Sequence, residues 1–249
     1  MTTRFHIGAK RLESNLAAYA KRFDFLEVHM PAHGEPAPAL ATLRRWRKQV
    51  PPHFDFAVAV GPAATAVKPG KALDADLETA LSAADALQAR WVLMTTPLDV
   101  TPAAIWRERL GKVVARLRRD ATMLAWEPRG LWEHDDAERF ARDLGLVLVT
   151  DPLRDAIPAG PIAYLRLRAL GETRSFGTAA LERVVAATFG RRDAYVILET
   201  PSALAECKRL RQLAQGHKRE GGFGRVIRPR GEAMAARGAS LRVKDDEQE

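Results

Sequence analysis

The 249-residue chain predicts a (β/α)8 barrel that forms a single domain. Two observations support this fold class. Short apolar runs with the two-residue period of a β-strand alternate strictly with segments that have the three-and-four spacing of an amphipathic helix. Eight such pairs follow one another over about 215 residues without a break in composition, which is typical of a parallel barrel. We therefore expect one barrel domain over residues 4–215.

Eight segments are expected to form the strands, because each is apolar or alternating and is followed by residues that interrupt a strand. They are 5–8, 24–30, 54–60, 91–95, 122–127, 146–151, 162–168 and 195–199. In the fifth, Ala125 and Glu127 share one face and Trp126 takes the other. Pro128 has no backbone N–H to donate, so this strand should end there.

Amphipathic spacing predicts a helix after most of the strands. The expected helices cover 12–23, 39–50, 74–87, 101–119, 135–144, 179–187 and 202–215. Thr101 followed by Pro102 has the residue types of an N-cap and a first helical position, and Gly145 is a typical C-terminal cap. Residues 63–71 are expected to form a loop.

The bulk composition indicates a globular, cytoplasmic protein. Hydrophobic residues make up 47% of the chain and charged residues 28%. Cys207 is the only cysteine in the sequence, so no intramolecular disulfide can form and a reducing compartment is favoured. No signal segment is recognisable at the N-terminus, and no apolar run approaches the ~18 residues of a membrane span.

The charge balance favours an anionic partner. The formal net charge is +8 and the isoelectric point is about 10.0. Residues 216–249 combine glycines with clustered lysine and arginine and end in an acidic stretch, so we expect a disordered basic tail outside the barrel. Its Gly-Gly-Phe-Gly-Arg segment, residues 221–225, has the composition of arginine–glycine segments that contact nucleic acid.

Polar side chains close five of the expected strands, and the two-residue period places them on the inner face at the open end of the barrel. They are Glu27, His29, Glu127, Arg129, Asp151, Arg166, Arg168 and Glu199. A buried, unpaired charge costs several kcal/mol, roughly, so these groups must pair, bind an ion, or face solvent and a ligand.

Three interpretations of this ring remain open. The first is an ion-pair plug that joins Arg166 to Glu127 and Arg168 to Asp151. The second is an anion site in which arginines hold a phosphate or carboxylate and a glutamate transfers a proton. The third is a metal site; its ligands would be Glu27, His29, Glu127, Asp151 and Glu199. No local motif has metal-ligand spacing and three arginines would oppose a cation, so we predict no metal, and no residue pattern identifies a cofactor.

The order of several motifs resembles that of a known family. The segments are Phe25-Leu26-Glu27-Val28, Trp46 before Pro51-Pro52-His53-Phe54-Asp55-Phe56, Glu127-Pro128-Arg129 with Trp132, Asp151, and Tyr164-Leu165-Arg166-Leu167. Over about residues 5 to 213 they are similar to the YecE-like family (domain of unknown function 72). The resemblance implies a TIM barrel without an established activity. The family's likeness to endonuclease-IV and xylose-isomerase-like barrels suggests nucleic-acid or phosphate-ester chemistry.

The chain also departs from the family pattern. Ala9-Lys10-Arg11 stands where the family has glycine and tryptophan, Ala59 replaces a lysine, His29 an asparagine and Arg168 a histidine. Glu199-Thr200 stands in place of asparagines. A chain that keeps the acids and arginines of the family but loses these residues has a changed ligand or has lost catalysis.

Our leading hypothesis is an enzyme that binds a phosphate-bearing metabolite or a nucleic-acid fragment at the carboxyl end of the barrel. Glu127 would be the general acid or base, with Glu27 and Asp151 as orienting carboxylates. The anion and the rest of the ligand would contact Arg129, Arg166, Arg168, His29 and Glu199. The alternative is a non-catalytic nucleic-acid-binding protein that acts through residues 216–249.

Overall fold

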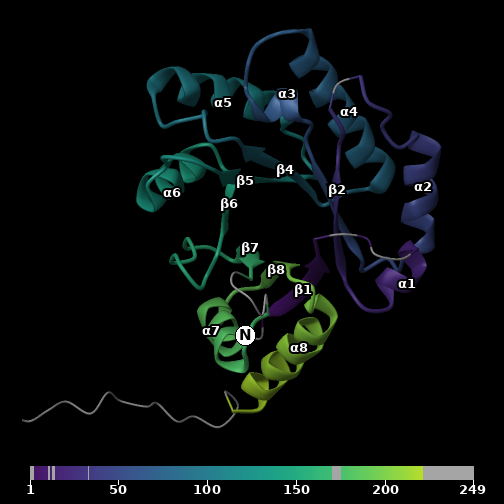
Figure 1. Ribbon diagram of the computed structural model, residues 1–249, viewed down its shortest axis with the longest axis vertical. Helices are drawn as coiled ribbons and strands as arrows, with labels where there is room; N and C mark the ends of the chain where they lie inside the picture. Colours follow the sequence, from purple (N-terminus) through teal and green to yellow (C-terminus); the bar gives the residue numbers. More distant parts are fainter. Residues whose placement is uncertain (1–2, 11, 13–14, 33, 170–174, 221–249) are drawn as a thin grey trace, which may run out of the picture.

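A computed structural model of the chain confirms the (β/α)8 barrel. The structure describes residues 3–10, 12, 15–32, 34–169 and 175–220. Eight parallel strands form one sheet in the order β1-β8-β7-β6-β5-β4-β3-β2, which brings β1 and β2 together at the seam of a nearly closed barrel. Helices surround this sheet (Figure 1).

The strands lie close to their expected positions. They are β1 (Arg4–Ala9), β2 (Phe25–His29), β3 (Asp55–Ala59), β4 (Trp91–Thr96), β5 (Met123–Pro128), β6 (Val147–Thr150), β7 (Ile162–Arg168) and β8 (Asp193–Glu199). As expected, β5 ends at Pro128.

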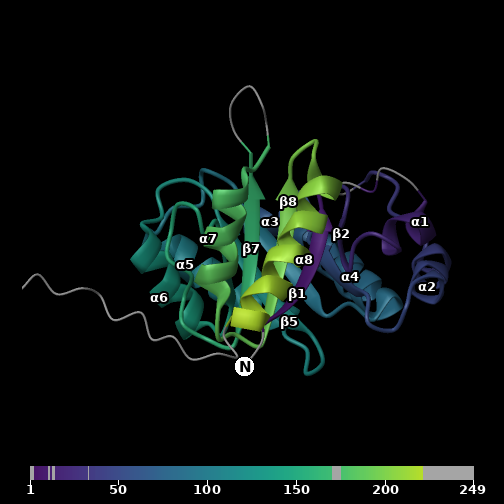
Figure 2. The same cartoon turned by 90° about the horizontal axis from the view of Figure 1, so that it is seen from below.

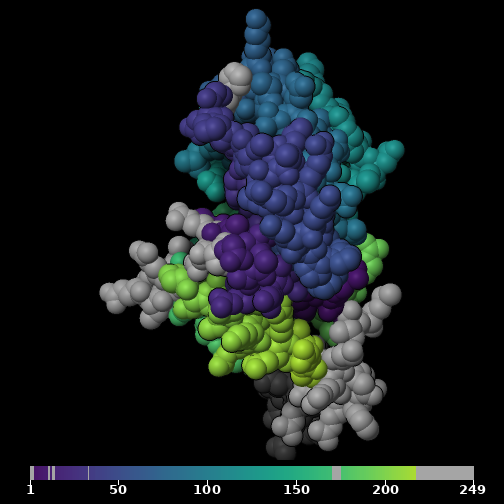
Figure 3. Space-filling model, turned by 90° about the vertical axis from the view of Figure 1, so that its right-hand side faces the viewer, coloured from purple at the N-terminus to yellow at the C-terminus, as the bar shows by residue number. Residues whose placement is uncertain are grey.

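The helices cover the outside of the barrel. They are α1 (Leu16–Ala20), α2 (Leu40–Gln49), α3 (Pro62–Thr65), α4 (Lys71–Leu87), α5 (Ala104–Leu117), α6 (His134–Asp143), α7 (Thr178–Thr188) and α8 (Ala203–Glu220). Figure 2 shows α7 and α8 in front of β7, β8 and β1. On the face shown in Figure 3, α1 fills the space between α2 and α8.

A tyrosine from α1 bridges the seam between β1 and β2. The backbone ladder contributes a bond from Asp24 N to Ile7 O at 2.9 Å. The hydroxyl group of Tyr19 accepts from Ala9 N at 2.8 Å and donates to Phe25 O at 2.9 Å. A Cβ atom on Gly8 would lie 2.5 Å from Phe25 O, so only glycine allows this close approach. The seam is thus closed by a side chain where regular strand pairing is interrupted.

The predicted inner and outer faces of the strands are confirmed for their apolar residues. Inward residues form one apolar cluster inside the barrel, which includes Phe25, Trp91, Tyr164 and Tyr195. Outward residues pack against the helices; Trp126, for example, has its ring 4.8 Å from that of Trp132. The apolar cluster fills the barrel between its two ends, so the interior is a packed core and not a channel.

Two expectations about local structure are wrong because tertiary contacts decide them. Residues 63–71 were expected to be a loop, but Pro62–Thr65 form α3, whose first N–H groups at Ala63 and Ala64 are bound by the carboxylate of Asp76 on α4 at 2.8 and 3.2 Å. A cap supplied from a distant helix leaves no local signal. The same carboxylate explains Gly61, where a Cβ atom would lie 2.5 Å from Asp76 Oδ2.

The helix expected to begin at Thr101 and Pro102 begins at Ala104, with Ala103 as its N-cap. The indole of Trp132 binds Val100 O at 2.8 Å, and Arg107 Nε binds Pro102 O at 2.7 Å. The first bond is a tertiary contact and the second joins residues five apart. Together they hold the preceding residues as a loop, whereas the sequence favoured a cap at Thr101.

Three other helices differ from the expectation by three residues or more at one or both ends. The helix expected over 74–87 begins at Lys71. The helix expected over 12–23 is limited to Leu16–Ala20, with the side chain of Asn15 accepting from Ala18 N at 2.9 Å as its N-cap. The last helix continues past Gln215 to Glu220, because one glycine costs only about 1 kcal/mol within a helix. The remainder of the predicted tail, 221–249, lies outside the described residues.

Candidate active site at the carboxyl ends of the strands

A buried carboxylate at the end of β2 is the centre of the polar cluster. Glu27 is only 5% exposed. Its Oε1 accepts from the Tyr164 hydroxyl group at 2.6 Å and from Arg166 at 2.7 Å, and its Oε2 accepts from Arg166 at 3.0 Å. His29 Nε2 lies 3.4 Å from Oε2. Arg166 therefore binds Glu27 with both terminal nitrogens, the geometry that guanidinium and carboxylate groups favour.

Arg166 joins three carboxylates that come from three different strands. Besides Glu27, it donates to Glu199 Oε1 at 2.9 Å, and its Nε lies 3.0 Å from Glu127 Oε2. The Nε contact is an ion pair without hydrogen-bond geometry. Because Arg166 is 4% exposed, its charge is held almost wholly by these acids.

A second layer of cations lies nearer to solvent. Arg168 pairs with Glu127 and, through Nε at 3.3 Å, with Glu199. Lys10 Nζ donates to the same oxygen of Glu199 at 3.1 Å. The side chain of Arg168 is 37% exposed and that of Lys10 56%, against 5% for Arg166. The site thus has a buried floor of carboxylates around one arginine and a rim of cations that solvent can reach.

The pKa shifts follow from this arrangement. Burial would raise the pKa of the Glu27 carboxyl, but the charge of Arg166 and bonds from His29 and Tyr164 lower it to about 2. Burial also acts to raise the pKa of Glu199, and the two arginines lower it below its usual value. The pKa of the Tyr164 hydroxyl group is raised by burial and by the neighbouring Glu27. Glu27 and Glu199 are therefore anions at neutral pH, and Tyr164 remains a hydrogen-bond donor.

Asp151 occupies a different environment beside this cluster. Its Oδ1 accepts from Leu153 N at 3.0 Å, and its Oδ2 lies 3.7 Å from Arg154. Burial raises the pKa of this carboxyl above its usual value, with the bond from Leu153 and the charges of Arg154 and Arg168 acting in the opposite direction. A carboxyl group of raised pKa in a polar site is suited to carry a proton.

The ion-pair pattern partly differs from the one considered in the sequence. The pair of Arg166 with Glu127 is present. Arg168 was paired with Asp151 in that interpretation, but in the structure it binds Glu127 and Glu199. The strand stagger places these two glutamates beside Arg168, while Asp151 turns back to its own loop.

Arg129 lies outside the network. Its side chain is exposed, and its backbone N–H donates to Thr96 O at 3.1 Å, which extends the β4–β5 ladder by one bond. Within the described part of the chain, no ion pair joins Arg129 to the carboxylates of the floor. Its expected role as an anion clamp stays a prediction.

Three members of the site were missed in the sequence. Tyr164 was noted within a segment that resembles the family, and its bond to Glu27 was not expected. Thr95 Oγ1 donates to Glu127 Oε2 at 3.3 Å, and Lys10 contacts Glu199. Lys10 directly follows β1. The sequence pointed to it only because Ala9-Lys10-Arg11 departs from the family pattern.

The described residues contain no group of three or more histidine, cysteine, aspartate or glutamate side chains placed to hold a metal ion. The glutamates of the floor instead surround guanidinium groups. No helix among the described residues is long and apolar enough to cross a membrane.

Comparison with known proteins identifies the class of this barrel. A family model described as "Protein of unknown function DUF72" matches residues 4–228. The chain therefore belongs to the DUF72 family, which agrees with the resemblance seen in its sequence motifs. No curated protein matches the chain at a significant level.

Solved structures show the same fold. A DUF72 family protein from Enterococcus faecalis V583 has a TM-score of 0.69 at 13% identity, with 85% of this chain and 96% of that chain covered. A DUF72 family protein from Thermotoga maritima has a TM-score of 0.58 at 16% identity, with 88% and 99% covered. A D-psicose 3-epimerase from Clostridium cellulolyticum H10 has a TM-score of 0.54 at 11% identity, again with 88% and 99% covered. At these identities the likeness shows the fold alone.

Proposed function

We propose that this protein is an enzyme that transfers a proton on a small anionic metabolite, such as a sugar phosphate or a sugar acid, at the carboxyl end of the barrel. The observation that carries the proposal is the contrast between the two arginines on β7. Arg166 is enclosed by three carboxylates, whereas the side chain of Arg168 is more than a third exposed. Arg168 therefore offers a charged fork to a ligand that approaches from solvent.

In this proposal the anion binds to cations at the rim of the site, and not to Arg166 in its floor as the sequence suggested. Arg168 and Lys10 both contact Glu199, and both reach solvent. An oxyanion that binds these two cations exchanges one set of charge-assisted bonds for another, while Arg166 keeps Glu27 in place. In this proposal, Arg166, Glu27 and Tyr164 are positioning residues.

The acid–base role is divided between two carboxyl groups near Arg168. Glu127 contacts Arg168 directly and faces the mouth from β5, so it is suited to accept a proton from a ligand held by that arginine. Asp151, whose pKa is raised by burial, is suited to supply one. His29 is exposed at the end of β2, beside Glu27, and is placed to contact the remainder of the substrate.

The fold comparison is compatible with proton-transfer chemistry. A protein described as a D-psicose 3-epimerase has a similar barrel, so this scaffold accommodates an epimerase. At 11% identity the comparison shows only that such a scaffold can carry this chemistry, and it gives no residue of this chain a role.

A thermal-shift screen of the full-length protein against sugar phosphates and sugar acids tests the proposal. A ligand that stabilises the wild-type protein should lose most of its effect in Arg168→Gln and in Lys10→Gln. It should keep its effect in Arg142→Gln, a control on α6 whose side chain is 68% exposed. A shift that survives in both rim variants, or no shift with any anion, would contradict the proposed binding mode.

The catalytic assignment has its own test. With a substrate in hand, Glu127→Gln should reduce turnover by a factor of about 100 or more, since general acid–base catalysis contributes that much. Binding of the anion should be largely retained, because Arg168 remains. Unchanged turnover in Glu127→Gln would show that another group transfers the proton.

A further inference from the structure

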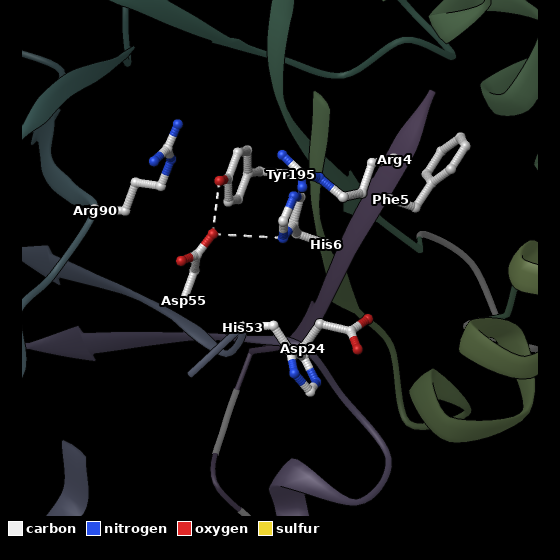
Figure 4. Close-up of a pocket in the computed structure, with 8 residues that line it drawn as sticks. All are labelled: Arg4, Phe5, His6, Asp24, His53, Asp55, Arg90 and Tyr195. Atoms are coloured by element: carbon white, nitrogen blue, oxygen red, sulfur yellow. Dashed lines mark hydrogen bonds and ion pairs between the residues drawn. The ribbon is translucent and has the colours of Figure 1, made fainter. Parts of the chain in front are cut away.

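A polar cavity lies at the opposite end of the barrel from the candidate active site, where the strands begin. Its volume is about 310 Å³, roughly ten times the ~30 Å³ that one water molecule occupies in the liquid. The residues that line it lie in the first residues of the strands and in the segments that lead into them (Figure 4). Those used below are Arg4, His6, Asp24, Asp55, Arg90 and Tyr195.

The carboxylates of this cavity already have partners. Asp24 binds Arg211 of α8 at 2.6 Å. Asp55 accepts from the Tyr195 hydroxyl group at 2.7 Å, and His6 Nδ1 lies 3.4 Å from the same carboxylate. Asp24 is therefore paired with a cation, and one oxygen of Asp55 is occupied by the Tyr195 hydroxyl group.

His6 is held between two acids and against an aromatic ring. Its Nε2 lies 3.2 Å from Asp193, behind the cavity, and its ring stacks on that of Tyr195 with centroids 4.3 Å apart. Asp193 also binds Arg4 at 2.7 Å and Arg192 at 2.9 Å. The wall formed by β1 and β8 is thus rigid and has its charges matched.

Arg90 is the group whose bonding is incomplete. Its Nε is buried and has no hydrogen-bond acceptor among the described residues. No carboxylate in that part of the chain forms an ion pair with it. Figure 4 shows its guanidinium group on the same side of the pocket as the Tyr195 hydroxyl group. Because the buried Nε cannot be reached from the cavity, an anion there would bind the terminal N–H groups of this guanidinium group, which has no carboxylate partner in the described part of the chain.

The backbone holds the root of this arginine in place. Arg90 directly precedes β4; its N–H donates to Phe56 O at 3.0 Å, and its carbonyl accepts from Met123 N at 2.9 Å. The guanidinium group is therefore presented from a fixed point between β3 and β5. Arg4, whose side chain is 67% exposed and is paired with Asp193, lines the same cavity.

We propose that this cavity is a binding site for a small oxyanion, a phosphate or a carboxylate group, held by Arg90 with Arg4 on the opposite side. The Arg90 fork supplies paired N–H donors, and Tyr195 and His6 form the floor below the anion. The site is separate from the carboxyl end because the apolar cluster that includes Phe25, Trp91 and Tyr164 fills the barrel between them.

Isothermal titration of the full-length protein with inorganic phosphate and, separately, with malonate tests this site. The first probe is tetrahedral and the second carries planar carboxylates, so their relative affinities identify the preferred group. Arg90→Gln should weaken binding of the preferred probe about tenfold or more, the factor expected for a hydrogen bond to a charged group. Arg142→Gln, on the outer surface, should bind as the wild type does.

The mouth variant Arg168→Gln separates this site from the proposed function. Phosphate binding that is lost in Arg90→Gln and kept in Arg168→Gln supports the cavity. Binding lost only in Arg168→Gln, binding unaffected by Arg90→Gln, or no binding of either probe to the wild type overturns it.

Circular dichroism and the unfolding midpoint establish whether Arg90→Gln is folded. If that variant does not fold, Arg90→Lys decides the question, because it keeps the charge and the alkyl stem but lacks the fork. A weakening of about threefold or more is then expected. An unchanged affinity in Arg90→Lys contradicts the proposed role of the guanidinium group.

Discussion

The two ends of the barrel stabilise buried charge in different ways. Each end presents charged groups on the inner faces of strands. At the carboxyl end, Glu27 and Arg166 are both almost fully buried and satisfy each other. At the amino end, Asp193 is buried, but its partners Arg4 and Arg192 have side chains that are 67% and 54% exposed. One end therefore depends on an internal network, and the other relies on cations that water can still solvate.

Two tyrosines make the comparison direct. Tyr164 on β7 and Tyr195 on β8 are partners in register, and their rings lie 6.3 Å apart. The hydroxyl group of Tyr164 binds Glu27 at the carboxyl end, whereas that of Tyr195 binds Asp55 at the amino end. Neighbouring residues of the same type thus connect one apolar core to two opposite polar sites.

The largest expected difference between the ends concerns their arginines. Arg166→Met should lower the free energy of unfolding by about 3–5 kcal/mol, because it leaves buried carboxylates without a counter-charge. Arg4→Met should lower it by about 1 kcal/mol or less, since that pair is largely exposed on the arginine side. Urea unfolding at pH 7 measures both. Equal losses would show that the network at the carboxyl end is not what distinguishes it.

Acid should weaken the carboxyl end through protonation of Glu27. Its pKa is lowered from 4.5 to about 2 in the folded protein, so its stabilisation is complete above pH 4.5 and is lost as the pH falls through about 2. The loss amounts to about 3 kcal/mol. Unfolding free energies measured between pH 6 and pH 2 should show it. In Glu27→Gln this part of the pH dependence should disappear, and its persistence would assign it to other acids.

A carboxylate at the amino end should behave in the same direction with a smaller effect of substitution. Burial acts to raise the pKa of Asp193, but bonds from Arg4, Arg192 and His6 lower it below its usual value. Its contribution is likewise present at neutral pH and lost on acidification. Asp193→Asn should cost about 1–2 kcal/mol at pH 7, because the two arginines regain water. A cost as large as that of Arg166→Met would contradict the distinction.

The smallest effect should come from the rim. Lys10→Gln removes one exposed pair with Glu199 and should change the free energy of unfolding by about 0.5 kcal/mol or less. The same substitution is expected to weaken anion binding at the mouth. A large loss of stability would instead make Lys10 part of the floor.

The sequence predicted the fold and the inner faces of the strands because both follow from the periodicity of apolar residues along the chain. Alternation placed Glu27, Arg166 and Glu199 inward, and the structure brings them together. It did not predict which acid each arginine binds, because that depends on the stagger of strands that are distant in sequence. Arg168 is an example, because its partners Glu127 and Glu199 come from β5 and β8. Asp151, the acid that the sequence suggested for it, lies in the loop after β6.

The polar cluster at the amino end of the barrel was not predicted, for a related reason. His6 and Asp55 lie in expected strands, but neither was among the expected site residues. Their meeting, and the unpartnered Nε of Arg90, depend on where three strands begin. The cap that Asp76 gives to α3 is another contact of this kind, made between helices and invisible to local pattern.

The two tyrosines provide the most direct test of the difference between the ends. Tyr164→Phe and Tyr195→Phe each remove one oxygen atom from the same layer of the barrel, and urea unfolding of the two variants compares them. Tyr164→Phe should cost about 2 kcal/mol, because its bond is to a buried, ionised glutamate, and Tyr195→Phe about 1 kcal/mol, because Asp55 keeps access to solvent. Equal costs, or a larger cost for Tyr195→Phe, would contradict the account of a buried network at the carboxyl end.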